Sequence, residues 1–146
     1  MIKKNVWLFL LLCIACENQS LMKHPLDKSQ SKTIVLDNEL KVYLLSDPDF
    51  NVSAASLAVD VGSLENPDNR LGLAHFLEHM LFLGTEKFPD VDEYSSYLKN
   101  NGGFSNAYTT TDHTNYQFQV LPDALEGAID RFAQFFIAPL FTEEYT

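Results

Sequence analysis

The stretch Leu71-Gly72-Leu73-Ala74-His75-Phe76-Leu77-Glu78-His79-Met80-Leu81-Phe82-Leu83-Gly84 decides the interpretation of this chain. Its residues are apolar nearly all round and end at a glycine, which predicts a buried helix from Leu71 to Leu83 with Gly84 as its C-cap. Only three polar, titratable side chains interrupt it: His75, Glu78 and His79. Burying such side chains without a metal or a partner is costly, so the pattern indicates a functional site on this helix.

The spacing of these three residues favours a metal centre. His75 and His79 are four residues apart, so a helix brings both imidazoles to one face, with Glu78 on the adjoining edge. Imidazole nitrogen suits zinc, and a carboxylate beside zinc can accept a proton from water. We therefore predict a Zn²⁺ site held by His75 and His79, with Glu78 as general base. The alternative, one core histidine and one exposed histidine, leaves this spacing unexplained.

The surrounding sequence predicts a sheet packed against helices. Pro89 opens a second helix that Gly102-Gly103 ends, and Pro122 opens a third that Pro139 closes, with an apolar stripe of Leu125, Ile129, Phe132 and Phe136. Runs of alternating or β-prone residues predict strands at 33–36, 41–45, 55–61, 104–111 and 116–121. Because strands and helices are interspersed, we expect an α/β (α+β) fold of layered type.

Composition and charge exclude several classes of function. The chain has 146 residues, which is the size of one domain, and its 46% apolar content is enough for a packed core. A net charge of −10 without a Lys/Arg run argues against nucleic-acid binding. No apolar stretch reaches the roughly 18 residues of a membrane-spanning helix. The two cysteines, Cys13 and Cys16, provide neither a disulfide scaffold nor a cysteine zinc module.

The N-terminus is typical of an export signal. Lys3 and Lys4 precede ten apolar residues, 6–15, and a small residue then stands directly before Cys16. We predict a signal peptide at 1–15 and a polar tether at 16–31, with the folded domain at 32–146. Cys16 is where a bacterial lipoprotein would be lipidated, but ordinary signal cleavage and a buried N-terminal element are alternatives. We expect an exported protein, periplasmic or held at the membrane by that lipid alone.

Four blocks of sequence together resemble one peptidase family. They are Gly72–Thr85, Gly102–Tyr108, Asp112–Tyr116 and Asp130–Phe136. The first contains H-x-x-E-H, the inverted order of the zincin motif H-E-x-x-H. In combination they are similar to the N-terminal domain of the M16 metallopeptidases, in the insulysin/pitrilysin branch, and the resemblance covers residues 32–146.

The resemblance implies a role for each matching residue. His75 and His79 match the zinc ligands and Glu78 the catalytic base, while Asn106 and Ala107 match the edge strand that binds the substrate backbone. His113 matches a position that binds no metal. In that family the third zinc ligand is a glutamate on a later helix, and Glu143 and Glu144 come too early to be that residue.

The expected function is therefore zinc-dependent hydrolysis of peptides. A catalytic zinc needs three protein ligands, so we expect the 146 residues alone to be inactive and to form part of a larger assembly. The remaining M16 domains would be supplied by the full-length chain or by a partner chain. One alternative is a catalytically inactive, peptide-binding or structural member of the same fold. Another, an unrelated metal-binding lipoprotein, leaves the block from Gly102 to Tyr116 unexplained.

Overall fold

The computed structural model describes residues 23–145, and the chain divides after Asp49 into two compact units. The predicted signal peptide at 1–15 and Cys16 lie outside the described residues. Within the described part, no helix is long and apolar enough to cross a membrane.

The first unit is a β-hairpin. Strands β1 (Gln30–Val35) and β2 (Lys41–Ser46) pair antiparallel, with Gln30 opposite Ser46 and Val35 opposite Lys41. Both predicted strands are confirmed, but β1 begins inside the predicted tether, since the length of β2 offers Gln30 and Ser31 pairing partners.

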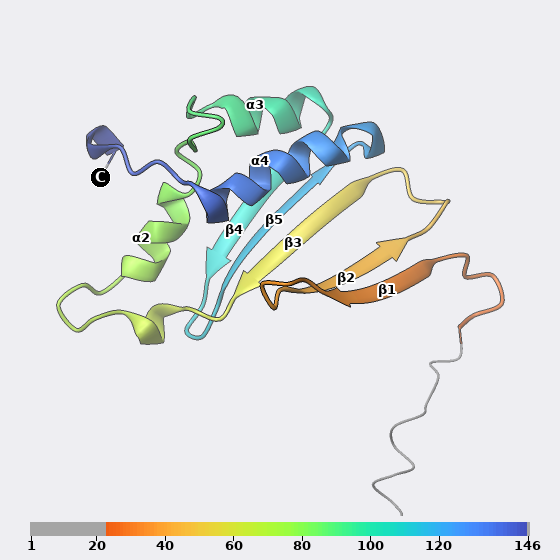
Figure 1. Ribbon diagram of the computed structural model, residues 1–146, viewed down its shortest axis with the longest axis horizontal. Coiled ribbons are helices and arrows are strands. Elements are labelled where there is room, and N and C mark those ends of the chain that lie inside the picture. Colours follow the sequence, from red (N-terminus) through yellow and green to blue (C-terminus); the bar gives the residue numbers. More distant parts are fainter. Residues whose placement is uncertain (1–22, 146) are drawn as a thin grey trace, which may run out of the picture. The chain divides into compact units, whose positions relative to one another are not determined.

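The second unit contains a three-stranded antiparallel sheet in the order β3-β5-β4 (Figure 1). The strands are β3 (Ser53–Val59), β4 (Phe104–Thr109) and β5 (Thr114–Val120). β5 is central, and its alternating Tyr116, Phe118 and Val120 are all buried, as the sequence pattern predicts. The strong alternation fixes the register, because a slip by one residue would expose this entire apolar set.

Helices cover one face of this sheet. They are α2 (Leu73–Met80), α3 (Glu93–Asn100) and α4 (Leu125–Ile137), with short 3₁₀ turns at Ser63–Glu65, Pro122–Ala124 and Glu143–Tyr145. The expected layered α/β architecture is confirmed. The buried apolar core joins α3, α4, β5 and the segment after α2, and consists of Leu81, Tyr94, Leu98, Tyr116, Phe118, Val120, Ala124, Ala128, Phe132 and Phe135.

Two of the predicted helices differ from expectation. The helix predicted at 71–83 is shorter and is not buried all round: Phe76 and Leu77 are exposed, and 3₁₀-type hydrogen bonds from Phe82 and Leu83 end it before Gly84. In α4 the buried stripe is Ala128, Phe132 and Phe135, whereas Ile129 and Phe136 are exposed. Ala128, Phe132 and Phe135 are spaced four and three residues apart and share one helix face, so this face packs on the core and Ile129 and Phe136 lie beside it.

The junction between α3 and β4 depends on two glycines. Gly102 has a φ of +67°, in the left-handed region that favours glycine, and the N–H of Gly103 donates to the carbonyl of Leu98 to close the helix. A Cβ on Gly103 would lie 2.2 Å from the carbonyl oxygen of Gln119 in β5. Only glycine therefore lets β4 start this close to its partner strand.

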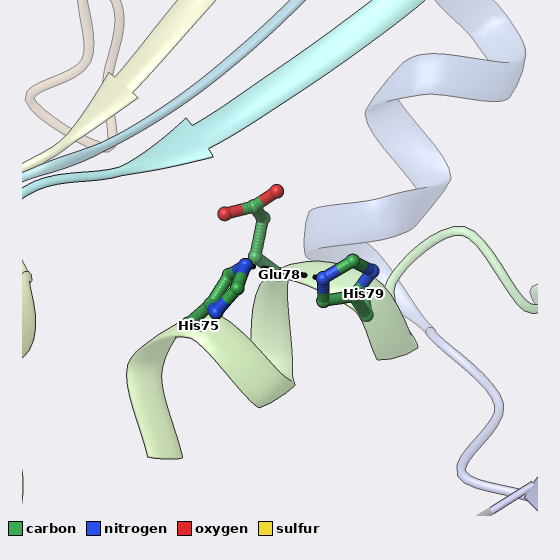
Figure 2. A group of neighbouring side chains, drawn as sticks. All are labelled: His75, Glu78 and His79. Atoms are coloured by element: carbon green, nitrogen blue, oxygen red, sulfur yellow. Dashed lines mark hydrogen bonds between the residues drawn. The ribbon is translucent and has the colours of Figure 1, made fainter. Parts of the chain in front are cut away.

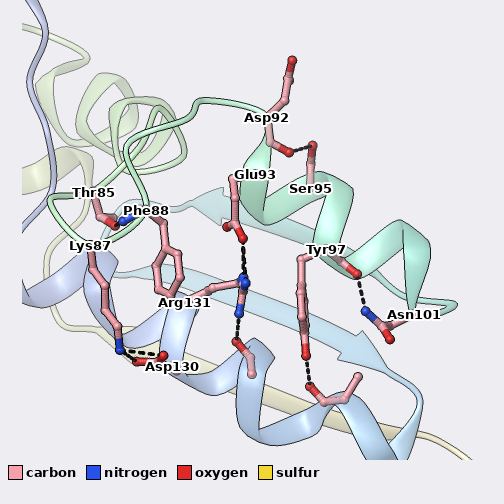
Figure 3. A network of polar contacts seen from close by, with 12 residues as sticks. Thr85, Lys87, Phe88, Asp92, Glu93, Ser95, Tyr97, Asn101, Asp130 and Arg131 are labelled. Atoms are coloured by element: carbon pink, nitrogen blue, oxygen red, sulfur yellow. Dashed lines mark hydrogen bonds and ion pairs between the residues drawn. The ribbon is translucent and has the colours of Figure 1, made fainter.

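Arg131 ties α4 to α3 and to the loop before it (Figure 3). Its guanidinium pairs with Glu93 at 2.7 Å and donates to the carbonyl of Gly127 at 3.0 Å. The same group lies over the rings of Phe88, at 4.5 Å, and Tyr97, at 3.8 Å. This partly buried cluster fixes the segment that connects α2 to the rest of the unit.

Candidate metal centre

The metal centre that the sequence predicts lies on α2, a helix whose start is well defined. Gly72 precedes it with a φ of +86°, and the Asn66 side-chain oxygen accepts a hydrogen bond from the N–H of Ala74 at 2.9 Å. That bond satisfies one of the free donors in the first turn, as an N-cap side chain would. The helix therefore presents its next turn, which carries the motif, in a fixed orientation.

His75 and His79 meet on one face of this helix (Figure 2). Their Nε2 atoms are 3.1 Å apart, and the ligand atoms of His75, Glu78 and His79 all lie within 4.8 Å of one another. The structure thus brings together the three residues that the spacing predicts. Both imidazoles are exposed, however, so the expected burial of all three side chains is correct only for Glu78.

The geometry of the two imidazoles fits zinc. Two nitrogens that ligate one tetrahedral zinc at 2.0–2.1 Å are separated by about 3.3 Å. The observed separation of 3.1 Å therefore needs only a small adjustment. His79 also lies in the last turn of α2, where the negative end of the helix dipole favours a cation. Neutral imidazole nitrogen is a preferred zinc donor, so donor type and spacing agree.

Glu78 differs from the two histidines because it points into the protein. Its side chain is directed from α2 toward the strands (Figure 2), and only 6% of the residue is exposed. The Thr109 hydroxyl donates a hydrogen bond of 2.6 Å to Glu78 Oε2. Within residues 23–145, Glu78 Oε1 has no hydrogen-bond partner. One oxygen is therefore held by the sheet, while the other is free to bind water.

The charge of Glu78 also acts on Tyr116 of β5. Burial first, and then the negative charge of Glu78, raises the pKa of the Tyr116 hydroxyl from 10 to about 12. Because only 6% of Glu78 is exposed, water screens its charge less than it would at the surface.

Asn106 and Ala107, the predicted substrate-binding residues, lie in the middle of β4. β4 pairs only with β5 among the described residues, so it is the edge strand that the sequence predicts. Asn106 is exposed, whereas Ala107 packs against the core. An edge strand can bind an extended peptide through its unpaired main-chain groups. Their role in substrate binding remains a prediction.

Other candidate ligands lie outside the cluster. His113 Nδ1 is 2.8 Å from Asp112 and 2.9 Å from the Thr110 hydroxyl, in the turn between β4 and β5. This agrees with the structural role expected for it. In the described part of the chain the cluster has no fourth member, and Glu143 does not join it.

Sequence reasoning missed Thr109. It stands 31 residues from Glu78, and no spacing rule connects a helix residue to a hydroxyl at the end of a strand. The one available signal is the alternation of side chains along a strand. Thr109 is two residues after Ala107, so the side chains of both residues point to the same face of β4.

The chain is similar to known peptidases in sequence. Residues 41–146 match the family model described as insulinase, peptidase family M16. The chain is 57% identical to insulin-degrading enzyme of Drosophila melanogaster over 120 residues, which are 82% of this chain. It is 54% identical to insulin-degrading enzyme of Homo sapiens over 121 residues, which are 83% of this chain.

A solved structure has the same fold. The crystal structure of pitrilysin superposes with a TM-score of 0.81 and 42% sequence identity, over 88% of this chain and 14% of that one. The chain spans only 12% of the length of either insulin-degrading enzyme.

Proposed function

Because the chain belongs to peptidase family M16, the insulinase family, we propose that it forms the zinc-binding part of the catalytic centre of a metalloendopeptidase. The observation that supports this most strongly is the 3.1 Å separation of the His75 and His79 Nε2 atoms beside a buried carboxylate. The two imidazoles would hold the metal, and Glu78 would serve as the base.

Zinc, when bound, polarises the scissile carbonyl and lowers the pKa of a nearby water. Glu78 Oε1 accepts a proton from the attacking water and then delivers it to the nitrogen of the leaving amine. During these steps the Thr109 hydroxyl donates its hydrogen bond to Oε2. β4 holds the peptide in extended form along Asn106 and Ala107, with main-chain hydrogen bonds that tolerate many side chains.

Further domains are needed for the complete site. A catalytic zinc takes three protein ligands, and the two histidines supply two of them. We propose that a third ligand and the opposite wall of the substrate chamber come from parts of an M16 peptidase beyond these 146 residues. The chain matches only 12% of the length of the Drosophila insulin-degrading enzyme and 14% of the pitrilysin chain, which supports this proposal.

The substrates we propose are peptides of about the size of insulin, by analogy with the relatives named above. The test is insulin degradation by the full-length gene product, followed by chromatography and mass spectrometry. We expect cleavage that a zinc chelator abolishes and added zinc restores. Cleavage that continues after complete metal removal would contradict the proposal, and metal-loaded protein without any cleavage would favour the inactive alternative.

We also propose export to the bacterial periplasm, supported by Lys3, Lys4 and the apolar run at 6–15. Cell fractionation and labelling with radioactive palmitate test this. Labelled protein in the membrane fraction that Cys16→Ser releases into the soluble periplasm would support lipidation. Unlabelled, processed periplasmic protein would support ordinary cleavage, and cytoplasmic protein of full length would contradict export.

A further inference from the structure

The carboxylate of Glu78 is held by a group outside its own helix. Thr109 makes the one hydrogen bond that Glu78 has among the described side chains, at 2.6 Å to Oε2. A bond of this length from a hydroxyl to a carboxylate is typical of a charge-assisted hydrogen bond. The hydroxyl carries one proton, so this bond fixes the orientation of both groups.

The sheet fixes the position of Thr109. It is the last residue of β4 and lies opposite Thr114 of β5. The Thr114 hydroxyl donates to the carbonyl of Val61 at 2.8 Å and lies 3.3 Å from the Thr109 hydroxyl. Thr109 is the acceptor in its contact with Thr114 and the donor in its shorter contact with Glu78, so its one proton points to the carboxylate. Thr109 is also β-branched, which restricts its side chain to few rotamers.

We propose that Thr109 is a positioning residue that fixes the Glu78 carboxylate to the substrate-binding strand. The inference rests on the proposed function, because it gives Glu78 the role of base. Thr109 holds Oε2 and thereby turns Oε1 toward the water. The same strand carries Asn106 and Ala107, so one strand would position both the base and the peptide.

A purely structural role for the hydroxyl makes a different prediction. A threonine that only satisfies a buried carboxylate would affect stability and leave the alignment of base and peptide unchanged. A positioning residue affects kcat more than KM, because misalignment raises the barrier without weakening substrate binding. The two roles can therefore be separated by kinetics.

The first test compares variants of the full-length gene product on insulin. Thr109→Val keeps the shape and removes the hydroxyl, and should lower kcat by about 10- to 100-fold with KM and zinc content nearly unchanged. Thr109→Ser should restore most of the rate. Thr111→Val, on an exposed neighbouring threonine, is the matched control and should be neutral. If Thr109→Val does not fold, Thr109→Ala takes its place.

A wild-type kcat for Thr109→Val, or a loss that Thr109→Ser does not restore, would overturn the proposal. Glu78→Gln separates this failure from failure of the proposed function. If Glu78→Gln is inactive while Thr109→Val retains full kcat, only the role of Thr109 is wrong. If Glu78→Gln itself is fully active, the proposed function is wrong.

The second test needs no activity. Thermal unfolding of the metal-free protein is measured for Thr109→Val, Glu78→Leu and the double variant. We expect the double variant to lower Tm by less than the sum of the single variants, since each single change leaves a partner unpaired. Additive shifts would mean that the two side chains do not interact, and would overturn the proposal.

Discussion

The Nε2 atoms of His75 and His79 face each other at 3.1 Å across one turn of α2. Without a metal, one ring can donate its proton to the other across this distance. With a metal, both nitrogens must offer lone pairs, so both rings carry their remaining proton on Nδ1. Metal binding therefore requires the donor ring to carry its proton on Nδ1 instead of Nε2, and the cation would take the place of the hydrogen bond between the two rings.

Removal of either histidine should release the metal. In the full-length gene product, His75→Ala or His79→Ala leaves one imidazole on α2. We expect its zinc content after dialysis to fall from about one ion per chain to a small fraction, since catalytic sites rely on three protein ligands. His113→Ala, outside the cluster, should retain full zinc. Atomic spectroscopy measures the content, and full occupancy without His75 or His79 would rule out the assignment.

Arg131 should be sensitive even to a change to lysine. Arg131→Lys keeps the charge but loses the planar group that pairs with Glu93 and stacks between Phe88 and Tyr97, so we expect a loss of about 1–3 kcal/mol in the free energy of unfolding. The matched control is Lys87→Met, which removes the exposed pair with Asp130 and should cost at most about 1 kcal/mol. Urea unfolding compares them; equal losses would contradict the role given to Arg131.

Gly103→Ala should destabilise the start of β4. The added Cβ would lie 2.2 Å from the Gln119 carbonyl oxygen, which forces the two strands apart. We expect a loss of about 1–3 kcal/mol and faster hydrogen exchange in β4. Gly72→Ala is the opposite case, with a φ of +86° but no atom within 4 Å, and should leave hydrogen exchange in β4 unchanged. Unchanged hydrogen exchange in β4 of Gly103→Ala would show that the strand accommodates the methyl group and would contradict the prediction.

Tyr116 should make the protein less stable at high pH. Its pKa is raised from 10 to about 12 in the folded state, so the folded protein holds a proton that the unfolded chain releases. Stability is therefore fully present below pH 10 and falls as the pH rises toward 12, by at most about 1.4 kcal/mol per pH unit.

The measurement is urea unfolding between pH 9 and about pH 12. Tyr116→Phe should reduce the slope of stability against pH, whereas Tyr43→Phe, on a residue that is 65% exposed, should not. An unchanged slope in Tyr116→Phe would mean that other groups cause the alkaline loss.

The sequence predicted elements well where a local pattern decides the structure. The alternation of Tyr116, Phe118 and Val120 predicted β5 and its buried face, and the four-residue spacing of His75 and His79 predicted that their nitrogens meet. These features follow from the period of a strand and of a helix alone.

The remaining features depend on tertiary packing. Phe76 and Leu77 are as apolar as core residues, so the sequence does not indicate that α2 leaves them exposed. The rotation of α4 that buries Ala128 instead of Ile129 depends on the space the sheet offers. The bond from Thr109 to Glu78 exists because α2 packs on the end of β4, which no local pattern encodes.

The central claim, that Glu78 is the base beside a zinc held by His75 and His79, is tested most directly by Glu78→Gln. The amide keeps the shape and can still accept the Thr109 hydrogen bond, but it cannot take a proton. In the full-length gene product we predict wild-type zinc content and insulin hydrolysis reduced by at least about 100-fold, with Glu126→Gln on the exposed side of α4 unaffected. Hydrolysis at the wild-type rate by zinc-loaded Glu78→Gln would contradict the account.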